Sequence, residues 1–359
     1  MLSVGYGQGH HSAAAALAEE FSVRGWQTRT VDPCAMSSPR FFGLTQRFYN
    51  FCVRRMPWLW GVAYSCTDTA DWRGAMCLPV MKGCMRVISG LLEEYEPDCV
   101  VCTYPLYAYM LDDMASRGES VPPYVVVVTD AREISRPWML SSAPLVCVPD
   151  ELSAEKVVGT FGLDSATVAC TGFPVRRAFS CAAAHTPPTA DNLRIVYGAY
   201  CSTRRVCRDI KALATAYPLA DITVLAGQRS RGISRLLRLE SVCACVHVLS
   251  CTDRMDTLFA HAHLYVGKAG AATVFEAYAA RVPLLVNFAL PGQEQGNLEL
   301  LMEDGAGEWV DSTGDLVLAV WRLLRDGASL WSSKVRAMET AGRSGGAPCI
   351  VDKVEGLLV

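Results

Sequence analysis

VGKAGAATVFEAYAARVPLLVNFALPGQEQGN, residues Val266 to Asn297, sets the architecture of this chain. Apolar, small and polar residues follow one another there in blocks whose lengths are typical of strands, turns and helices. In order, we predict a short strand ending at Val266, a turn at 267–272, a helix at 273–280, a strand at 284–288, and a turn at Pro291–Gly292 that opens a second helix near Gln293. Repeated strand–helix order implies parallel strands with right-handed crossovers.

Both predicted helices begin just after a strand, so their N-termini meet at one edge of the sheet. Helix N-termini expose unpaired N–H groups and the positive end of the dipole, which suits a pyrophosphate. The expected phosphate ligands are Gly270, Ala271, Ala272 and the Thr273 hydroxyl. Three polar residues of the second turn are expected to bind sugar hydroxyls, with ordinary helix-start polarity as the alternative: Gln293, Glu294 and Asn297. The pattern predicts a nucleotide-sugar site.

Three motifs carry a family resemblance: KAGAATVFEA at 268–277, LPGQEQGN at 290–297 and GYGQGHHSAAAAL at 5–17. With them the chain resembles the monogalactosyldiacylglycerol synthase and processive diacylglycerol glucosyltransferase family, a relative of the lipid-II-forming N-acetylglucosaminyltransferase. The resemblance implies an α/β protein of the GT-B fold, with two Rossmann-like parallel-sheet domains and a cleft between them. It also implies inverting transfer of a hexose from a UDP-sugar to diacylglycerol or a glycosyldiacylglycerol.

The expected domain boundaries follow from the same comparison. An N-terminal domain that faces the acceptor and the membrane spans residues 1–180, and a proline- and alanine-rich linker spans 181–192. The UDP-sugar-binding domain spans 193–334, and the helices of 335–359 are expected to return to the N-terminal domain. Family members usually carry more strand residues before Gly5, which is compatible with a true start codon further upstream.

The amino-acid composition indicates which partners and which cell compartment to expect for this chain. The net charge is −3, so nucleic acid is not an expected partner. We find no apolar run of the roughly 18 residues that a spanning helix needs and no signal peptide. The 16 cysteines lie mostly in apolar runs, which indicates buried, reduced thiols. These features predict a cytoplasmic protein that is peripherally attached to the inner face of the cell membrane.

His10 is the candidate general base, because it lies at a turn before a helix and an ordinary histidine pKa near 6.5 suits proton uptake. The resemblance places the matching histidine of relatives at the acceptor. Two alternatives stay open: that His10 only stabilises the turn, or that the adjacent His11 is the base. Asp130, at the end of a predicted strand, is a second catalytic candidate.

Residues 33–67 contain no acidic residue, and they are rich in arginine and aromatic side chains. On a helix, Arg40, Arg47 and Arg54 would share one side, next to an apolar stripe. This pattern suits an anionic membrane surface, although an amphipathic helix packed on its own sheet would look similar. The expected acceptor and membrane contacts are Gly9, Arg47, Arg54, Arg55, Trp58 and Trp60.

Glu276 would accept hydrogen bonds from the two ribose hydroxyls, as the resemblance implies, but Thr273-x-x-Glu276 also fits a capping box. No Asp-x-Asp triplet stands at a strand end, so we expect a metal-independent reaction without a cofactor. Two positions depart from the family pattern: Ser135 replaces a histidine, and Gly198–Arg205 replaces a glycine-rich loop, although Arg204 and Arg205 could supply charge there. Two other functions therefore stay open, a lipid-II-type N-acetylglucosaminyltransferase and a catalytically degenerate nucleotide-sugar-binding protein.

Overall fold

The chain folds into two compact units. The computed structural model describes residues 1–5, 9–70, 72–180, 186–227, 232–250 and 252–358. Unit 1 consists of Met1–Arg177, Leu290–Gly296 and Gly345–Val359, and unit 2 consists of Ala178–Ala289 and Asn297–Ser344. The predicted linker falls partly on residues 181–185, which lie outside the described residues.

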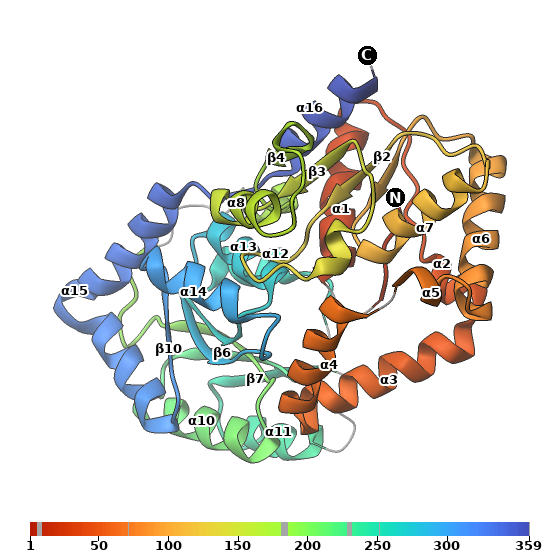
Figure 1. Cartoon of the computed structure of the whole chain (residues 1–359). Helices are drawn as coiled ribbons and strands as arrows, with labels where there is room; N and C mark the ends of the chain where they lie inside the picture. The colour runs from red at the N-terminus through yellow and green to blue at the C-terminus, as the bar shows by residue number, and fades with distance from the viewer. Residues whose placement is uncertain (6–8, 71, 181–185, 228–231, 251, 359) are drawn as a thin grey trace. The chain divides into compact units, whose positions relative to one another are not determined.

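Unit 1 contains a parallel four-stranded sheet of order β1-β2-β3-β4 (Figure 1). Its strands are β1 (Val100–Cys102), β2 (Tyr124–Val127), β3 (Leu145–Val148) and β4 (Val168–Cys170). Its helices are α1 (Gly9–Val23), α2 (Pro33–Ser37), α3 (Pro39–Arg55), α4 (Pro57–Thr69), α5 (Trp72–Ala75), α6 (Pro79–Tyr95), α7 (Pro105–Ser116), α8 (Glu151–Gly159) and α16 (Ala347–Leu358), with 3-10 turns at Arg136–Met139 and Ser165–Thr167. The short helix α9 (Arg177–Ser180) follows at the end of this part of the chain.

Alternating residues of these strands bury the two faces of the sheet, as strand geometry requires. On one face, Val101, Val125 and Val127 pack with residues of α1 and α16, two helices that lie side by side in Figure 1. On the other face, Cys102 and Val126 pack with residues of α6, α7 and α8. Because both faces are covered, the strands are apolar along their whole length.

Two local predictions for the first residues are wrong. The sequence predicts a strand at 27–31, but only an isolated bridge forms there, in which Leu2 pairs with Val31 and with Cys102. By its residue type Ser12 is a predicted N-cap, but α1 already begins at Gly9. His10 and His11 therefore belong to the first turn of the helix.

Unit 2 contains a parallel six-stranded sheet of order β10-β9-β8-β5-β6-β7. Its strands are β5 (Arg194–Gly198), β6 (Asp221–Leu225), β7 (Val246–Leu249), β8 (Leu264–Lys268), β9 (Leu284–Phe288) and β10 (Gly307–Trp309). Its helices are α10 (Thr203–Ala216), α11 (Ile233–Glu240), α12 (Met255–His261), α13 (Ala271–Ala280), α14 (Gln295–Glu303) and α15 (Thr313–Ala341). The backbone of α15 leaves the helical conformation at Arg325–Ala328.

The predicted strand–helix order of the opening stretch is confirmed. Strand β9 has the predicted bounds, and β8 pairs with it in parallel. One sheet face packs with α10, α11 and α15 around Tyr197, Ile222 and Val224. The α/β prediction with two parallel sheets is therefore confirmed. Within the described part of the chain, we find no helix with the length and apolarity that crossing a bilayer requires.

Candidate active site

His10 is held by two groups that lie far from it in sequence. Its Nδ1 is 2.7 Å from the carbonyl oxygen of Thr103 and 2.8 Å from Oγ1 of Thr129. A carbonyl oxygen only accepts, so Nδ1 carries the proton and Nε2 keeps a lone pair. Burial lowers the pKa of His10 to about 4, which corrects the expectation of an ordinary value near 6.5. At neutral pH the imidazole is therefore uncharged, the form that a general base needs.

Asp130 lies next to Thr129 in a buried position. Its Oδ2 accepts a hydrogen bond of 2.9 Å from Nε1 of Trp138. The rings of Trp138 and His10 have centroids 6.1 Å apart, so the structure brings both catalytic candidates around this tryptophan. Sequence reasoning missed this contact of Trp138 with the carboxylate. Ser135, which replaces the family histidine, lies between Asp130 and Trp138 in the sequence and is buried.

His11 lies in a different environment from His10. Its Nδ1 is 2.9 Å from Oγ of Ser3. Gly9 is the first residue of α1, while Gly7 and Gln8 lie outside the described residues. Asp32 accepts hydrogen bonds from the backbone N–H groups of Gly5 and Ala35.

The N-terminus of α13 provides the predicted phosphate-binding geometry in unit 2. Gly270 is the N-cap residue, and the first-turn residues Ala271, Ala272 and Thr273 follow it. The capping-box alternative is wrong, because Thr273 lies inside the helix and cannot be its N-cap. Glu276 is buried one turn further on.

Lys268 is a residue that sequence reasoning missed. It ends β8 immediately before the α13 turn, and its Nζ is 5.4 Å from the centroid of the Tyr200 ring. Arg205 was expected to supply charge in the loop at 198–205. Instead, its Nε donates to Asp209 at 2.8 Å. Its Nη1 donates to the carbonyl of Asp311. Arg205 therefore anchors α10, whereas Lys268 directly precedes the α13 turn in the chain.

The three predicted sugar-binding residues have protein partners. Oε2 of Glu294 accepts from the backbone N–H of Leu290 at 3.0 Å, within the same turn. Nδ2 of Asn297 donates to the carbonyl of Ala269 at 3.0 Å, and its buried Oδ1 has no hydrogen-bond partner. Oε1 of Gln293 accepts from Nε1 of Trp60 at 3.1 Å. Helix α14 begins at Gln295, so Gln293 and Glu294 precede it.

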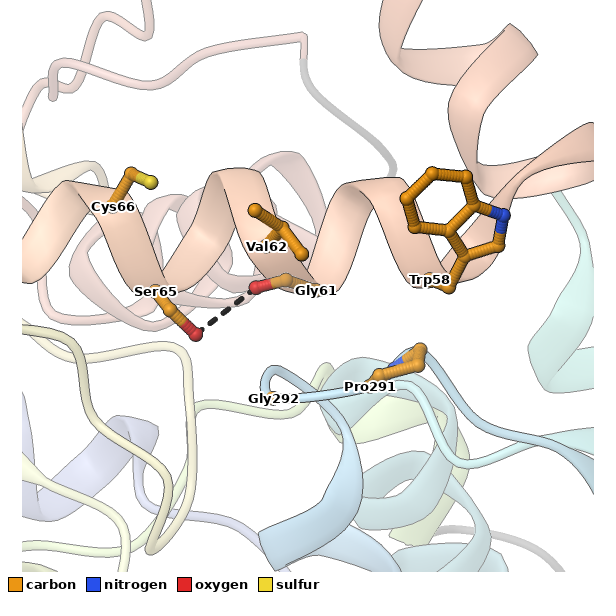
Figure 2. Close-up of a pocket in the computed structure, with 7 residues that line it drawn as sticks. All are labelled: Trp58, Gly61, Val62, Ser65, Cys66, Pro291 and Gly292. Atoms are coloured by element: carbon orange, nitrogen blue, oxygen red, sulfur yellow. Dashed lines mark hydrogen bonds between the residues drawn. The ribbon is translucent and has the colours of Figure 1, made fainter.

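An open pocket of about 540 Å³ lies in unit 1 between α4 and the Pro291–Gly292 turn (Figure 2). Its lining carries no charged side chain and consists of Trp58, Gly61, Val62, Ser65, Cys66, Pro291 and Gly292. A Cβ atom at Gly61 would lie 3.0 Å from Cβ of Pro291, so this close approach favours glycine. Gly292 has a φ of +78°, which also favours glycine.

The apolar stripe of α3 is exposed. This contradicts the alternative that the helix packs this stripe on the protein's own sheet. Leu44 is 64% exposed and Phe48 is 59% exposed, and Phe41 and Phe51 are exposed on the same side. Among the predicted contacts, Trp58 of α4 is 66% exposed and Arg47 is exposed. Trp60 differs, because its ring packs against Tyr49 with centroids 4.6 Å apart. The side chains of Arg54 and Arg55 lie outside the described part of the structure.

Among the described residues, no group of three or more His, Cys, Asp or Glu side chains has a geometry that could hold a metal ion.

The family model for monogalactosyldiacylglycerol (MGDG) synthase matches residues 10–175, the segment that contains His10, Asp130 and the exposed α3. The predicted family resemblance is confirmed. The processive diacylglycerol β-glucosyltransferase of Bacillus subtilis (strain 168) is 25% identical over 349 residues, covering 93% of this chain and 88% of that protein. The chloroplastic monogalactosyldiacylglycerol synthase 3 of Arabidopsis thaliana is 24% identical, covering 88% of this chain and 72% of that protein.

Solved structures give the fold. MurG of Acinetobacter baumannii superposes with a TM-score of 0.60 at 14% identity, covering 99% of this chain and 98% of that one. The calicheamicin glycosyltransferase CalG4 superposes with a TM-score of 0.59 at 17% identity, covering 99% of this chain and 97% of that one. The fold is GT-B, as predicted.

Proposed function

We propose that this chain is an inverting glycosyltransferase that moves a hexose from a UDP-sugar to diacylglycerol or a glycosyldiacylglycerol. The named relatives, which match most of the chain, are diacylglycerol glucosyltransferases and monogalactosyldiacylglycerol synthases. The observation that carries the proposal is the uncharged His10, fixed through Nδ1 with Nε2 left to accept a proton.

In the proposed reaction, Nε2 of His10 takes the proton of the acceptor hydroxyl as that oxygen attacks the anomeric carbon. The new glycosidic bond forms while the bond from carbon to the UDP oxygen breaks, and UDP leaves with the electron pair. The carbonyl of Thr103 and the hydroxyl of Thr129 hold the ring in orientation. Because its carboxylate already binds Trp138, we assign Asp130 a positioning role.

The donor would bind at the N-terminus of α13. Backbone N–H groups of Ala271 and Ala272, the Thr273 hydroxyl and the charge of Lys268 would meet the pyrophosphate as negative charge develops on it. Glu276 would accept from the ribose hydroxyls. Oriented dipoles and one cation would then supply the stabilisation for which other enzymes use a metal ion.

The membrane would be contacted by the exposed face of α3 and by Trp58. Exposed phenylalanine and leucine side chains next to Arg40 and Arg47 suit the headgroup region of an anionic bilayer. Such a surface would give access to an acceptor that is itself a membrane lipid. The proposed location is therefore the cytoplasmic side of a membrane, by peripheral attachment.

The test is transfer by the purified chain from UDP-glucose or UDP-galactose to diacylglycerol in mixed micelles, with products identified by mass spectrometry. We expect a glycosyldiacylglycerol and release of UDP. Transfer of N-acetylglucosamine to a lipid-II-type acceptor instead would favour the second enzyme class. Binding of UDP without transfer to any of these lipids would support a degenerate nucleotide-sugar-binding protein.

A further inference from the structure

Two buried thiols face each other where α2 packs on α6. Sγ of Cys34 lies 3.6 Å from Sγ of Cys84, within thiol–thiol hydrogen-bond distance. Both side chains belong to the core of unit 1. The hydroxyl of Ser37, on α2, lies 3.1 Å from Sγ of Cys84.

The surroundings make the two sulfurs chemically different. Hydrogen bonding with Cys34 and with Ser37 lowers the pKa of Cys84 to about 7, although burial opposes this effect. The same contact with Cys84, together with burial, raises the pKa of Cys34. Because the thiolate is the reactive form, Cys84 is the thiol that reacts with an oxidant first, and Cys34 is placed to react with the oxidised Cys84.

We propose that Cys34 and Cys84 form a reversible disulfide in the presence of a peroxide. The Cys84 thiolate attacks one oxygen of hydrogen peroxide, which gives a sulfenic acid and releases hydroxide. Cys34 then attacks the Cys84 sulfur, and the sulfenic oxygen leaves as water. The protein loses two electrons and two protons, and the peroxide is reduced to two molecules of water.

The bond would act on a defined part of unit 1. Residues 34–84 include α3, α4 and α5, so the disulfide would tie together the two ends of the segment with the exposed apolar face. A covalent link that closes a loop removes conformational freedom from the open chain. Oxidation would therefore reduce local opening of this segment. This inference does not depend on the proposed glycosyl transfer.

The linked residues can be identified by peptide mapping. Reduced protein is treated with hydrogen peroxide, alkylated and cut with trypsin. The expected product joins the peptide Thr30–Arg40 to the peptide Gly83–Arg86, each of which contains one cysteine. Cys34→Ser and Cys84→Ser should abolish this product, whereas the control Cys77→Ser, at an exposed thiol, should leave it unchanged. Dithiothreitol should release both peptides.

A second measurement follows limited trypsin cleavage between α2 and α6. The oxidised parent should be cleaved several-fold more slowly than the reduced parent, and peroxide-treated Cys34→Ala should show no such protection. If peroxide modifies exposed Cys66 or Cys77 while the Cys34 and Cys84 peptides stay unlinked, the proposal is wrong. A joined product without slower cleavage would refute the restraint on α3 to α5.

Discussion

His10 makes the stability of the protein depend on pH. Its pKa is about 4 in the folded chain, compared with about 6.5 in an unfolded chain, so the unfolded state binds the proton more tightly. The contribution is complete above pH 6.5 and is lost as the pH falls towards 4, amounting to about 3 kcal/mol in total. We would measure the free energy of unfolding in urea at pH 7.5 and at pH 4.5. Between these two conditions it should fall by about 2 to 3 kcal/mol less in His10→Gln than in the parent.

His11→Gln is the matched control for this pH effect. This variant removes the neighbouring imidazole, whose Nδ1 lies 2.9 Å from Oγ of Ser3, and leaves His10 in place, so it should lose as much stability on acidification as the parent. An equal loss for His10→Gln would show that other groups cause the acid sensitivity.

Glu276 tests donor binding separately from folding. Helix α13 is capped at Gly270 and needs no capping box, so Glu276→Gln should leave the melting temperature nearly unchanged. Loss of charge-assisted acceptance from the ribose hydroxyls should weaken UDP binding several-fold in calorimetry. The exposed Glu155→Gln provides a charge-matched control with parent-like affinity. Unchanged affinity in Glu276→Gln would remove this residue from the donor site.

Helix α3 is the element whose surface should bind membranes. Arg40→Ser with Arg47→Ser should weaken binding to anionic vesicles by about 1 kcal/mol per charge, and added salt should weaken binding of the parent. Phe48→Ser should also weaken binding, through loss of apolar contact with the bilayer. In vesicle sedimentation, Val242→Ser serves as the control, since it removes an exposed apolar side chain from unit 2. If the α3 variants sediment like the parent, this face has another partner.

Among the elements, those with strong local signals were predictable. Strands β8 and β9 each begin with a run of three apolar residues, Leu264–Val266 and Leu284–Val286, so their positions follow from the sequence. Strand β10 was not predicted, because its three residues, Gly307–Trp309, carry no strand periodicity and become a strand only by pairing with β9. The predicted strand at 27–31 has suitable residues but is reduced to a single bridge at Val31.

The surroundings of the candidate base were not predictable in the same way. Thr103 and Thr129 lie 93 and 119 residues from His10 in sequence, and only the order of the strands in unit 1 brings them to its ring. The position of His10 before a helix and the family resemblance therefore identified the histidine, but they left its tautomer and its lowered pKa unknown. Asn297 is a similar case. Its polar side chain was predicted to bind a sugar hydroxyl, whereas in the structure its amide nitrogen donates to the Ala269 carbonyl.

Across the whole molecule, the proposed functions of the two units should be separable. His10 belongs to unit 1 and Glu276 to unit 2, so each substitution should affect a different step. His10→Ala should lower kcat by about 10²- to 10⁴-fold, the usual contribution of a positioned base, and leave UDP affinity unchanged. Glu276→Gln should weaken UDP affinity, and the double variant should combine the two losses in kcat/KM additively in free energy.

Calorimetric UDP binding and transfer to diacylglycerol, measured for the parent, both single variants and the double variant, complete this cycle. His11→Ala, next to the candidate base but bonded to Ser3, is the control and should change kcat only slightly. Near-parent transfer by His10→Ala would pass the base role to Asp130 or His11, and Asp130→Asn would separate these two. A fall in UDP affinity for His10→Ala would mean that the imidazole contributes to donor binding, because a base that acts only on the acceptor has no effect on bound UDP.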